Sequence, residues 1–331
     1  MKAEKVCRIV LDKIVPDSTE RDRVTALAEE MRSKVGEAAR EASIPAEVRI
    51  DGSVAKDTWL SEDVDIDIFM RVPTTLNRRE LGTVCLDIAR NAAAGHRQVE
   101  RFAEHPYLET WIKKTRVNIV PCYNVDRGQW VSATDRTPFH TEYVRICLTE
   151  SLKNEVRLLK RFMKGIGVYS AEIKVKGFSG YLCELLVLQY SSFLEVLTAA
   201  ATSWSKGVII DLEKYYSGRE DEARKLFEAS VIIVDPVDKG RNAAAAVSNE
   251  KLGEFIAASN AFTKQPDLKF FYPPDTKPIK TKLLSRTLKT QGNDFLFIKF
   301  GKVKAVPDIL WGQLYKTQRS LKNLLKQNDF E

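Results

Sequence analysis

The sequence predicts an α+β multidomain chain, with a mixed-sheet domain first, an all-helical domain next and an incomplete, basic α/β segment last. Three observations support this order. Alternating apolar residues typical of strands gather in the first 138 residues, apolar stripes at helical spacing dominate the region that follows, and positive charge accumulates near the end. We therefore expect domains at residues 1–138, 139–262 and 263–331.

The first domain is predicted to begin with a long helix and to continue as strands around one further helix. Asp17 and Glu20 form a capping-box pattern before apolar positions that recur at helical spacing up to Ala38. Another helix is expected after Asn77. Strands are predicted at Glu47–Ile50, Val64–Val72, Gln98–Phe102, Leu108–Ile112 and Thr115–Val120.

The second domain is predicted to be helical. Leu152, Val156, Leu159 and Met163 form an apolar stripe, opposite a side crowded with lysine and arginine. Further helices are expected at Tyr181–Ala199 and Asn249–Ala261, with a short β run at Val231–Val234. The proline-containing segment Phe271–Lys280 is predicted to be a linker, followed by a strand at Phe295–Phe300 and a basic helix at Asp308–Asn328. A lone strand and helix cannot bury a two-sided core, so this segment either packs on the helical domain or belongs to a domain that continues beyond the given chain. We expect the second.

Composition and charge narrow the functional class. Hydrophobic residues make up 44% and charged residues 29% of the 331 residues, which is ordinary for a globular protein. Residues 271–331 contain twelve Lys/Arg and five Asp/Glu, so this segment carries the whole net charge of +7. A basic segment attached to a neutral remainder indicates an anionic partner, with nucleic acid as the first choice and a solvated charged surface as the alternative.

The five cysteines are scattered, which predicts reduced thiols in a cytoplasmic protein. The most apolar stretch, within Tyr181–Leu197, contains charged residues and is too short to span a bilayer, and the charged N-terminus lacks the apolar core of a secretion signal. We therefore expect no membrane attachment.

The sharpest chemical pattern is Gly52-Ser53, eleven residues, then Asp65 and Asp67. Carboxylates two residues apart on a strand project from one face, and their mutual repulsion favours a cation between them. Oxygen ligands suit Mg²⁺. Gly52 allows close backbone approach, Ser53 offers donors to a phosphate, and Lys56 adds a countercharge. Together these residues predict phosphoryl or nucleotidyl transfer assisted by two metal ions about 4 Å apart, although a solvent-facing strand edge would also explain the two aspartates.

Gly52-Ser53 with Asp65 and Asp67 resembles the DNA polymerase β-like nucleotidyltransferase superfamily. More narrowly, several strings resemble the archaeal, class I CCA-adding enzymes. These strings are Asp135-Arg136-Thr137-Pro138-Phe139-His140, Val156-Arg157-Leu158-Leu159-Lys160, Gly177-Phe178-Ser179-Gly180-Tyr181-Leu182-Cys183-Glu184, Val120-Pro121-Cys122-Tyr123 and Val234-Asp235-Pro236-Val237-Asp238. The resemblance is dense from Val48 to Tyr190 and becomes diffuse after Asn249.

The resemblance implies template-independent addition of CCA to the tRNA 3′ end from CTP and ATP. It also implies a nucleotidyltransferase head, a helical neck, and a body and tail that hold the tRNA acceptor arm, with a homodimer as the assembly. The residues implied to bind the nucleotide and its phosphates are Gly52, Ser53, Lys56, His140, Lys160, Tyr169 and Arg241, and His105 resembles a further pocket residue. Lys56 departs from the family, which usually has Arg there.

Four of these residues have simpler structural interpretations. Lys160 could lie on a solvated cationic helix face, and Tyr169 could be an ordinary half-buried aromatic residue. His140 could start a helix, and Arg241 could form a local ion pair with Asp235 or Asp238.

Asn118 is the main departure from the family pattern, which places a third metal-binding carboxylate at this position, before Pro-Cys-Tyr. An amide oxygen can bind a metal ion, but it carries no charge and cannot accept a proton from the attacking hydroxyl. Loss of a general base alone costs about 10²–10⁴-fold in rate. Asn118 is therefore either a deliberate substitution, a natural residue in a protein that binds tRNA without catalysis, or a residue whose role Glu109 or Asp126 takes over.

Two alternative functions follow. The chain could be an RNA-binding protein that has lost catalysis, for which Asn118 is the discriminating residue. It could also be a nucleotidyltransferase acting on a small molecule, which the concentration of positive charge near the C-terminus argues against.

Overall fold

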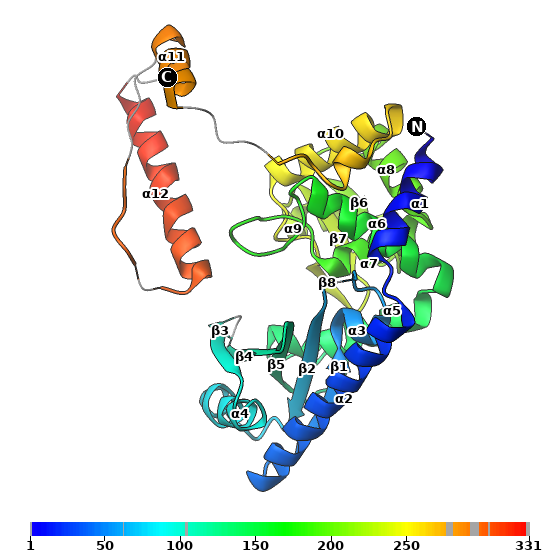
Figure 1. Cartoon of the computed structure of the whole chain (residues 1–331), viewed down its shortest axis with the longest axis vertical. Coiled ribbons are helices and arrows are strands. Elements are labelled where there is room, and N and C mark those ends of the chain that lie inside the picture. Colours follow the sequence, from blue (N-terminus) through cyan, green and yellow to red (C-terminus); the bar gives the residue numbers. More distant parts are fainter. Residues whose placement is uncertain are drawn as a thin grey trace. The chain divides into compact units, whose positions relative to one another are not determined.

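The computed structural model describes residues 2–61, 63–102, 105–275, 281–291, 298–303 and 305–328. The chain forms two compact units, residues 1–271 and residues 272–331. The head and neck regions that the sequence predicts both lie in the first unit. Figure 1 shows this unit as a sheet-containing half and a mainly helical half.

The sheet-containing half is built on five strands in the order β1-β2-β5-β4-β3. Strands β2 and β5 are parallel, and the other neighbouring pairs are antiparallel. All five strands overlap the predicted ones. Their bounds are β1 Glu47–Asp51, β2 Asp65–Val72, β3 Arg97–Phe102, β4 Pro106–Ile112 and β5 Thr115–Tyr123.

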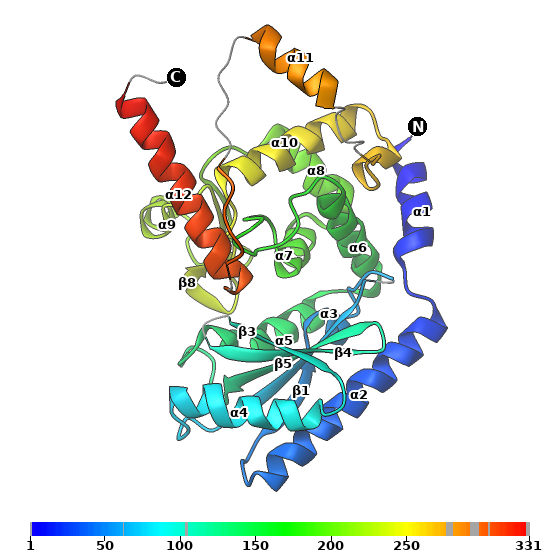
Figure 2. The same cartoon turned by 60° about the vertical axis from the view of Figure 1, so that its left-hand side comes forward.

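Two long helices cover one face of this sheet, α2 (Ser18–Glu41) and α4 (Arg78–Ala92) (Figure 2). Side chains from both helices join those of alternate strand residues in one buried core. Asp17 accepts a hydrogen bond from the Glu20 N–H at 2.7 Å, and Asn77 with Glu80 forms a complete capping box, so local signals fix both helix starts.

Two shorter helices, α3 (Gly52–Lys56) and α5 (Thr137–Cys147), lie on the other face, over β1 and β2. The half of this face formed by β5, β4 and β3 extends beyond them. This second face carries Asp65 and Asp67, because Ile66 and Ile68 point into the opposite core.

The helical half is built around α6, α7 and α8. A cluster of buried phenylalanines packs between these helices and α10, and α1 packs against α6. The region predicted to be all-helical also carries a small sheet in the order β6-β7-β8, whose central strand contains the expected Val231–Val234 run. The bounds are α1 Ala3–Ile14, η1 Ala133–Arg136, α6 Glu150–Gly165, α7 Gly180–Tyr190, α8 Phe193–Thr202, β6 Val208–Ile210, α9 Glu220–Phe227, β7 Val231–Asp235, β8 Asp238–Asn242, α10 Asn249–Lys264 and η2 Leu268–Phe270.

The single helix predicted at Tyr181–Ala199 is wrong, because α7 and α8 meet there at an 87° bend. Ser191 ends α7 in the left-handed conformation, with φ 68°, and the Ser192 hydroxyl accepts a hydrogen bond from the Glu195 N–H at 3.1 Å. These two serines therefore stop one helix and cap the next. In the described residues no single helix is long and apolar enough to cross a membrane, and only the bent α7–α8 pair meets that test, by length and composition.

The second unit contains α11 (Thr281–Gln291) and α12 (Pro307–Gln327). The predicted basic helix at Asp308–Asn328 is confirmed by α12, whereas α11 was not predicted. The predicted strand at Phe295–Phe300 lies partly outside the described residues, and its described part, Ile298–Phe300, has no regular secondary structure.

Candidate active site

A cleft of about 870 Å³ lies where the sheet-containing half meets the helical half of the first unit. Residues of α3, β2 and α5 line one side of it, and residues of α6, α7 and β8 line the other. All the sequence-predicted site residues except Asn118 and His105 line this cleft. They are Gly52, Ser53, Lys56, Asp65, Asp67, His140, Lys160, Tyr169 and Arg241.

The two aspartates stand at the start of β2, directly beside the α3 turn. Gly52 has φ 68° and approaches Asp67 so closely that a Cβ there would lie 2.0 Å from the Asp67 Oδ2. Any other residue would therefore be strained and would displace this carboxylate. The sequence predicts that Gly52 allows close backbone approach. In the structure, the group that the Gly52 backbone approaches is the Asp67 carboxylate.

Asn118 lies beside Asp67 because the parallel register of β2 and β5 pairs their Cα positions. The Asn118 side-chain N–H donates to Asp67 Oδ1 at 2.9 Å. Burial raises the pKa of Asp67 to about 6, with the Asn118 hydrogen bond opposing the shift and the Asp65 charge adding to it. The negative charge of Asp67 therefore lowers the stability of the folded chain unless a cation lies close to this carboxylate.

The same register pairs Asp65 with Arg116. The Arg116 guanidinium donates to both Asp65 oxygens, with Nε at 2.7 Å from Oδ1. This pairing holds the pKa of Arg116 above its usual value, since the Asp65 carboxylate stabilises the charged form. Arg116 therefore neutralises the charge of Asp65, one of the three residues predicted to bind a metal ion.

The donor set fits one hard divalent cation that completes its coordination with ligands from a substrate. Asp65 and Asp67 offer adjacent carboxylates, and Mg²⁺ is commonly held by one or two carboxylates together with substrate phosphates. Among the described residues no group of three or more His, Cys, Asp or Glu side chains could hold a metal ion by itself. At position 118, where the family pattern has a carboxylate, this chain offers an amide oxygen beside Asp67.

Two lysines converge on one buried glutamate at the opposite wall of the cleft. Lys56 Nζ lies 2.5 Å from Glu184 Oε2 and Lys160 Nζ lies 3.3 Å from Oε1, while the Thr58 hydroxyl donates to Oε1 at 2.6 Å. Lys160 is 3% exposed and Glu184 is 1% exposed. The solvated-face interpretation of Lys160 is therefore wrong, because this lysine points into the cleft from the buried side of α6.

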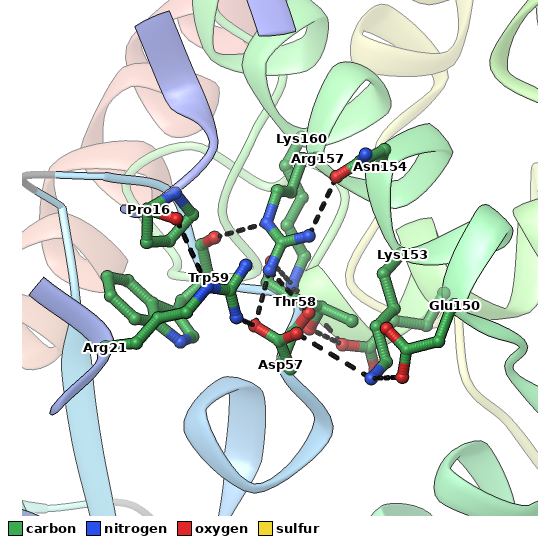
Figure 3. Close-up of polar contacts among 11 residues, drawn as sticks. Pro16, Arg21, Asp57, Thr58, Trp59, Glu150, Lys153, Asn154, Arg157 and Lys160 are labelled. Carbon is green, nitrogen blue, oxygen red and sulfur yellow. Dashed lines mark hydrogen bonds and ion pairs between the residues drawn. The ribbon is translucent and has the colours of Figure 1, made fainter. Parts of the chain in front are cut away.

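The short helix α3 is fastened to α6 through Asp57, which ends α3 in the left-handed conformation. Figure 3 shows Arg21, Lys153 and Arg157 converging on Asp57. Arg157 is 2% exposed and donates to the Asp57 carboxylate at 2.6 Å and to the Trp59 carbonyl at 2.9 Å. This cluster fixes the α3 turn, and with it Ser53 and Lys56, relative to the helix that carries Lys160.

His140, in the first turn of α5, faces β7 and β8. Its Nε2 lies 2.8 Å from the buried Asp235 Oδ2, and its ring stacks on Tyr181 with centroids 4.2 Å apart. Burial lowers the pKa of His140, and the Asp235 carboxylate opposes that shift. Arg241 donates to the same Asp235 oxygen at 2.6 Å, so the local ion pair that the sequence suggests as an alternative interpretation of Arg241 is present. Arg241 also lines the cleft.

The remaining predicted residues have distinct surroundings. Tyr169 lies close to Gly180 and under the Lys164 ammonium, which is 5.0 Å from its ring centroid. His105 is buried, and its Nε2 lies 2.8 Å from the Thr134 hydroxyl. It is not among the residues that line the cleft.

The two acids considered as replacements for a third carboxylate differ in position. Glu109 pairs in register with Asn118 on β4, is buried, and accepts from Arg101 Nε at 3.0 Å. Asp126 lies past the far end of β5, and the strand from Asn118 to Tyr123 alone spans roughly 17 Å. Of the two, only Glu109 is a neighbour of Asn118 in the sheet.

Glu184 and Asp235 stand in the sequence motifs without a predicted role in the site, and no sequence pattern points to Arg116. The signals were present: Glu184 interrupts an apolar helix, and Asp235 follows four apolar strand residues. A buried acid in such a run requires a cationic partner, which the structure supplies as lysines and as Arg241.

Known proteins share the fold of this chain. Solved structures with the same fold include the Cid1 poly(U) polymerase, with a TM-score of 0.62 and 14% identity over 81% of this chain and 95% of that one. Another is CdnC of E. coli MS115-1, with a TM-score of 0.58 and 17% identity over 82% of this chain and 95% of that one. Residues 27–144 match the family described as nucleotidyltransferase domain, so the chain is a nucleotidyltransferase.

The other two family matches and the curated relatives are more specific. Residues 154–272 match the second domain of tRNA nucleotidyltransferase, and residues 291–331 match the C-terminal domain of the CCA-adding enzyme. Curated CCA-adding enzymes are 38% identical in Methanopyrus kandleri, over 100% of this chain, and 40% identical in Methanosarcina barkeri and Sulfolobus acidocaldarius, over 97%. The chain belongs to the CCA-adding enzyme family, and it spans 69–71% of the length of these three relatives.

Proposed function

We propose that this chain adds CCA to the 3′ end of tRNA, without a nucleic-acid template, from CTP and ATP. The observation that carries the proposal is the cleft itself, which joins the two β2 aspartates to a pair of buried lysines from α3 and α6. Metal-binding carboxylates beside phosphate-binding cations are the groups that nucleotidyl transfer requires.

The cations and donors on the α3 and α6 side hold the triphosphate of the incoming nucleotide. Ser53 and Lys56 lie on the α3 turn, and Lys160 and Tyr169 reach the cleft from α6 and the segment after it. His140 and Arg241, both held by Asp235, complete the nucleotide pocket. A triphosphate that enters this cleft takes the place of Glu184 as the partner of the lysines.

Asp65 and Asp67 hold Mg²⁺ together with the nucleotide phosphates. When bound, Mg²⁺ stabilises the negative charge that develops on the phosphate oxygens. The tRNA 3′-hydroxyl loses its proton to solvent water as its oxygen forms a bond to the α-phosphorus. The bond from that phosphorus to the oxygen that bridges the α- and β-phosphates breaks, and pyrophosphate leaves towards Lys56 and Lys160.

Asn118 slows this reaction, since its amide supplies neither the negative charge nor the proton acceptor that a carboxylate would offer beside Asp67. We expect a rate about 10²–10⁴-fold below that of a chain with Asp at this position. A second candidate function, tRNA binding without turnover, is favoured by the same residue together with the Arg116 guanidinium on Asp65.

We further propose that the acceptor arm is the part of tRNA that is bound, with the basic residues after residue 270 contacting its phosphates. We also propose that the chain forms a homodimer and acts in the cytoplasm. Light scattering of the purified chain tests whether it is a dimer. Head, neck and body domains at 1–138, 139–262 and 263–331 remain the functional division that we propose.

The proposal is tested with a tRNA transcript that ends immediately before CCA, incubated with the chain, Mg²⁺, CTP and ATP, and read by sequencing of the product 3′ ends. We expect slow addition of C, C and A in that order, and none with Asp67→Ala. Binding of the transcript without any extension, even at long times, would favour the binding-only candidate. Extension by the Asp67→Ala variant would contradict the assignment of the cleft.

A further inference from the structure

A row of side chains crosses the sheet outward from Asp65. The strand registers pair Asp65 with Arg116, Arg116 with Trp111, and Trp111 with Arg97, so these four residues share one face on four neighbouring strands. We refer to Arg116, Trp111 and Arg97 as the arginine–tryptophan strip. It begins at a cleft aspartate and ends on β3, the edge strand of the sheet.

The side chains of this strip are accessible and partly stacked. Arg97 is exposed, and its guanidinium lies 4.4 Å from the Trp111 ring centroid. Trp111 is half-buried, and the Arg116 side chain is 42% exposed despite its pairing with Asp65. Helix α3 packs against β1 and β2, and α5 packs against β1, on the other part of the sheet.

The position of the strip relative to the lysines decides which substrate it faces. Lys56 follows β1, which flanks β2 on one side, whereas the strip lies on β5, β4 and β3 on the other side. In-line displacement at phosphorus places the attacking and leaving oxygens on opposite sides. If pyrophosphate leaves towards Lys56 and Lys160, as the proposed function requires, the attacking hydroxyl arrives from the side of the strip.

We propose that the arginine–tryptophan strip binds the unpaired 3′ end of the RNA acceptor. The two guanidinium groups contact backbone phosphates, and a base stacks on the Arg97–Trp111 pair. Cations that track a backbone, with an aromatic surface for bases, are the general means by which proteins bind single-stranded nucleic acid. This inference rests on the proposed function and assigns a surface to its RNA substrate.

The test compares the binding of two RNA hairpins, one with a short unpaired 3′ overhang and one with a blunt end. Arg97→Gln and Trp111→Leu should each weaken binding of the overhang hairpin by about tenfold, and leave binding of the blunt hairpin and of CTP unchanged. Trp111→Phe should retain overhang binding, because it preserves an aromatic surface. Arg97→Gln should also lower the slope of log affinity against log salt by about 0.7, the share of one single-strand phosphate.

The matched control is Arg79→Gln, which removes the same charge from an exposed position on α4, against the opposite face of the sheet. It should leave binding of both hairpins unchanged. If the overhang hairpin binds the unsubstituted chain, Arg97→Gln and Trp111→Leu with equal affinity, the inference about the strip is overturned. The proposed function is then unaffected. An unsubstituted chain that binds CTP but neither hairpin would overturn both.

Discussion

Glu184 provides the most direct test of the cleft electrostatics, because one buried carboxylate compensates two buried ammonium groups. Burial opposes its ionisation, but Lys56 and Lys160 outweigh that effect and hold the pKa of Glu184 below its usual value. Glu184→Gln keeps the size of the side chain and removes its charge. Breaking a buried pair by removing one partner costs about 3–5 kcal/mol, since the other charge remains buried.

We expect the melting temperature of Glu184→Gln, measured by calorimetry without nucleotide, to fall by roughly 10 °C. Addition of CTP should raise it more than in the unsubstituted chain, because the triphosphate supplies the lost negative charge. Glu195→Gln, at an exposed position in the first turn of α8, is the matched control and should change the melting temperature little. A fall of less than 2 °C in Glu184→Gln, or an unchanged response to CTP, would refute this account of the lysines.

Three further predictions concern the aspartates and the α3 turn. Gly52→Ala should abolish nucleotide incorporation, because the new Cβ would lie 2.0 Å from Asp67 Oδ2, whereas Gly36→Ala, with open space at its Cβ, should leave incorporation unchanged. In the metal-free chain Asp67→Asn should raise the melting temperature much more at pH 8 than at pH 4. Because the pKa of Asp67 rises from 3.8 to about 6 on folding, its buried charge destabilises the chain progressively as the pH rises from about 4 to 6 and fully above that range, and equal effects at both pH values would argue against this assignment. Arg157→Met should destabilise the chain by about 1–3 kcal/mol in urea unfolding, because it removes the donor to the Trp59 carbonyl and one of the three cations on Asp57. A loss below about 0.5 kcal/mol would count against the cluster in Figure 3.

The sheet could be predicted from the sequence because each of its strands carries its own local signal. Alternation along Val64–Val72 separates Ile66 and Ile68 from Asp65 and Asp67, and this alternation alone places both aspartates on one face. The bend between α7 and α8 could not be predicted in the same way, since only two serines interrupt a long apolar run. Strand β8 (Asp238–Asn242) was missed because its residues are almost all polar.

The site was predicted as a set of residues, whereas their partners depend on tertiary structure. Lys160 shares its helix with four other cations, so periodicity placed it on a solvated side, and only the approach of Glu184 from α7 explains its burial. Arg116 became part of the site through the parallel pairing of β2 with β5, which no local pattern encodes. Long-range pairing of this kind is what single-sequence analysis lacks.

The most direct test of the central claim is a single-turnover comparison of the unsubstituted chain with Asn118→Asp, on tRNA ending before CCA, with Mg²⁺, CTP and ATP. We expect both to add CCA, with Asn118→Asp faster by about 10²–10⁴-fold, because it restores a carboxylate beside Asp67. Equal rates would contradict the role assigned to Asn118, and failure of both chains to extend the tRNA would contradict the proposed activity.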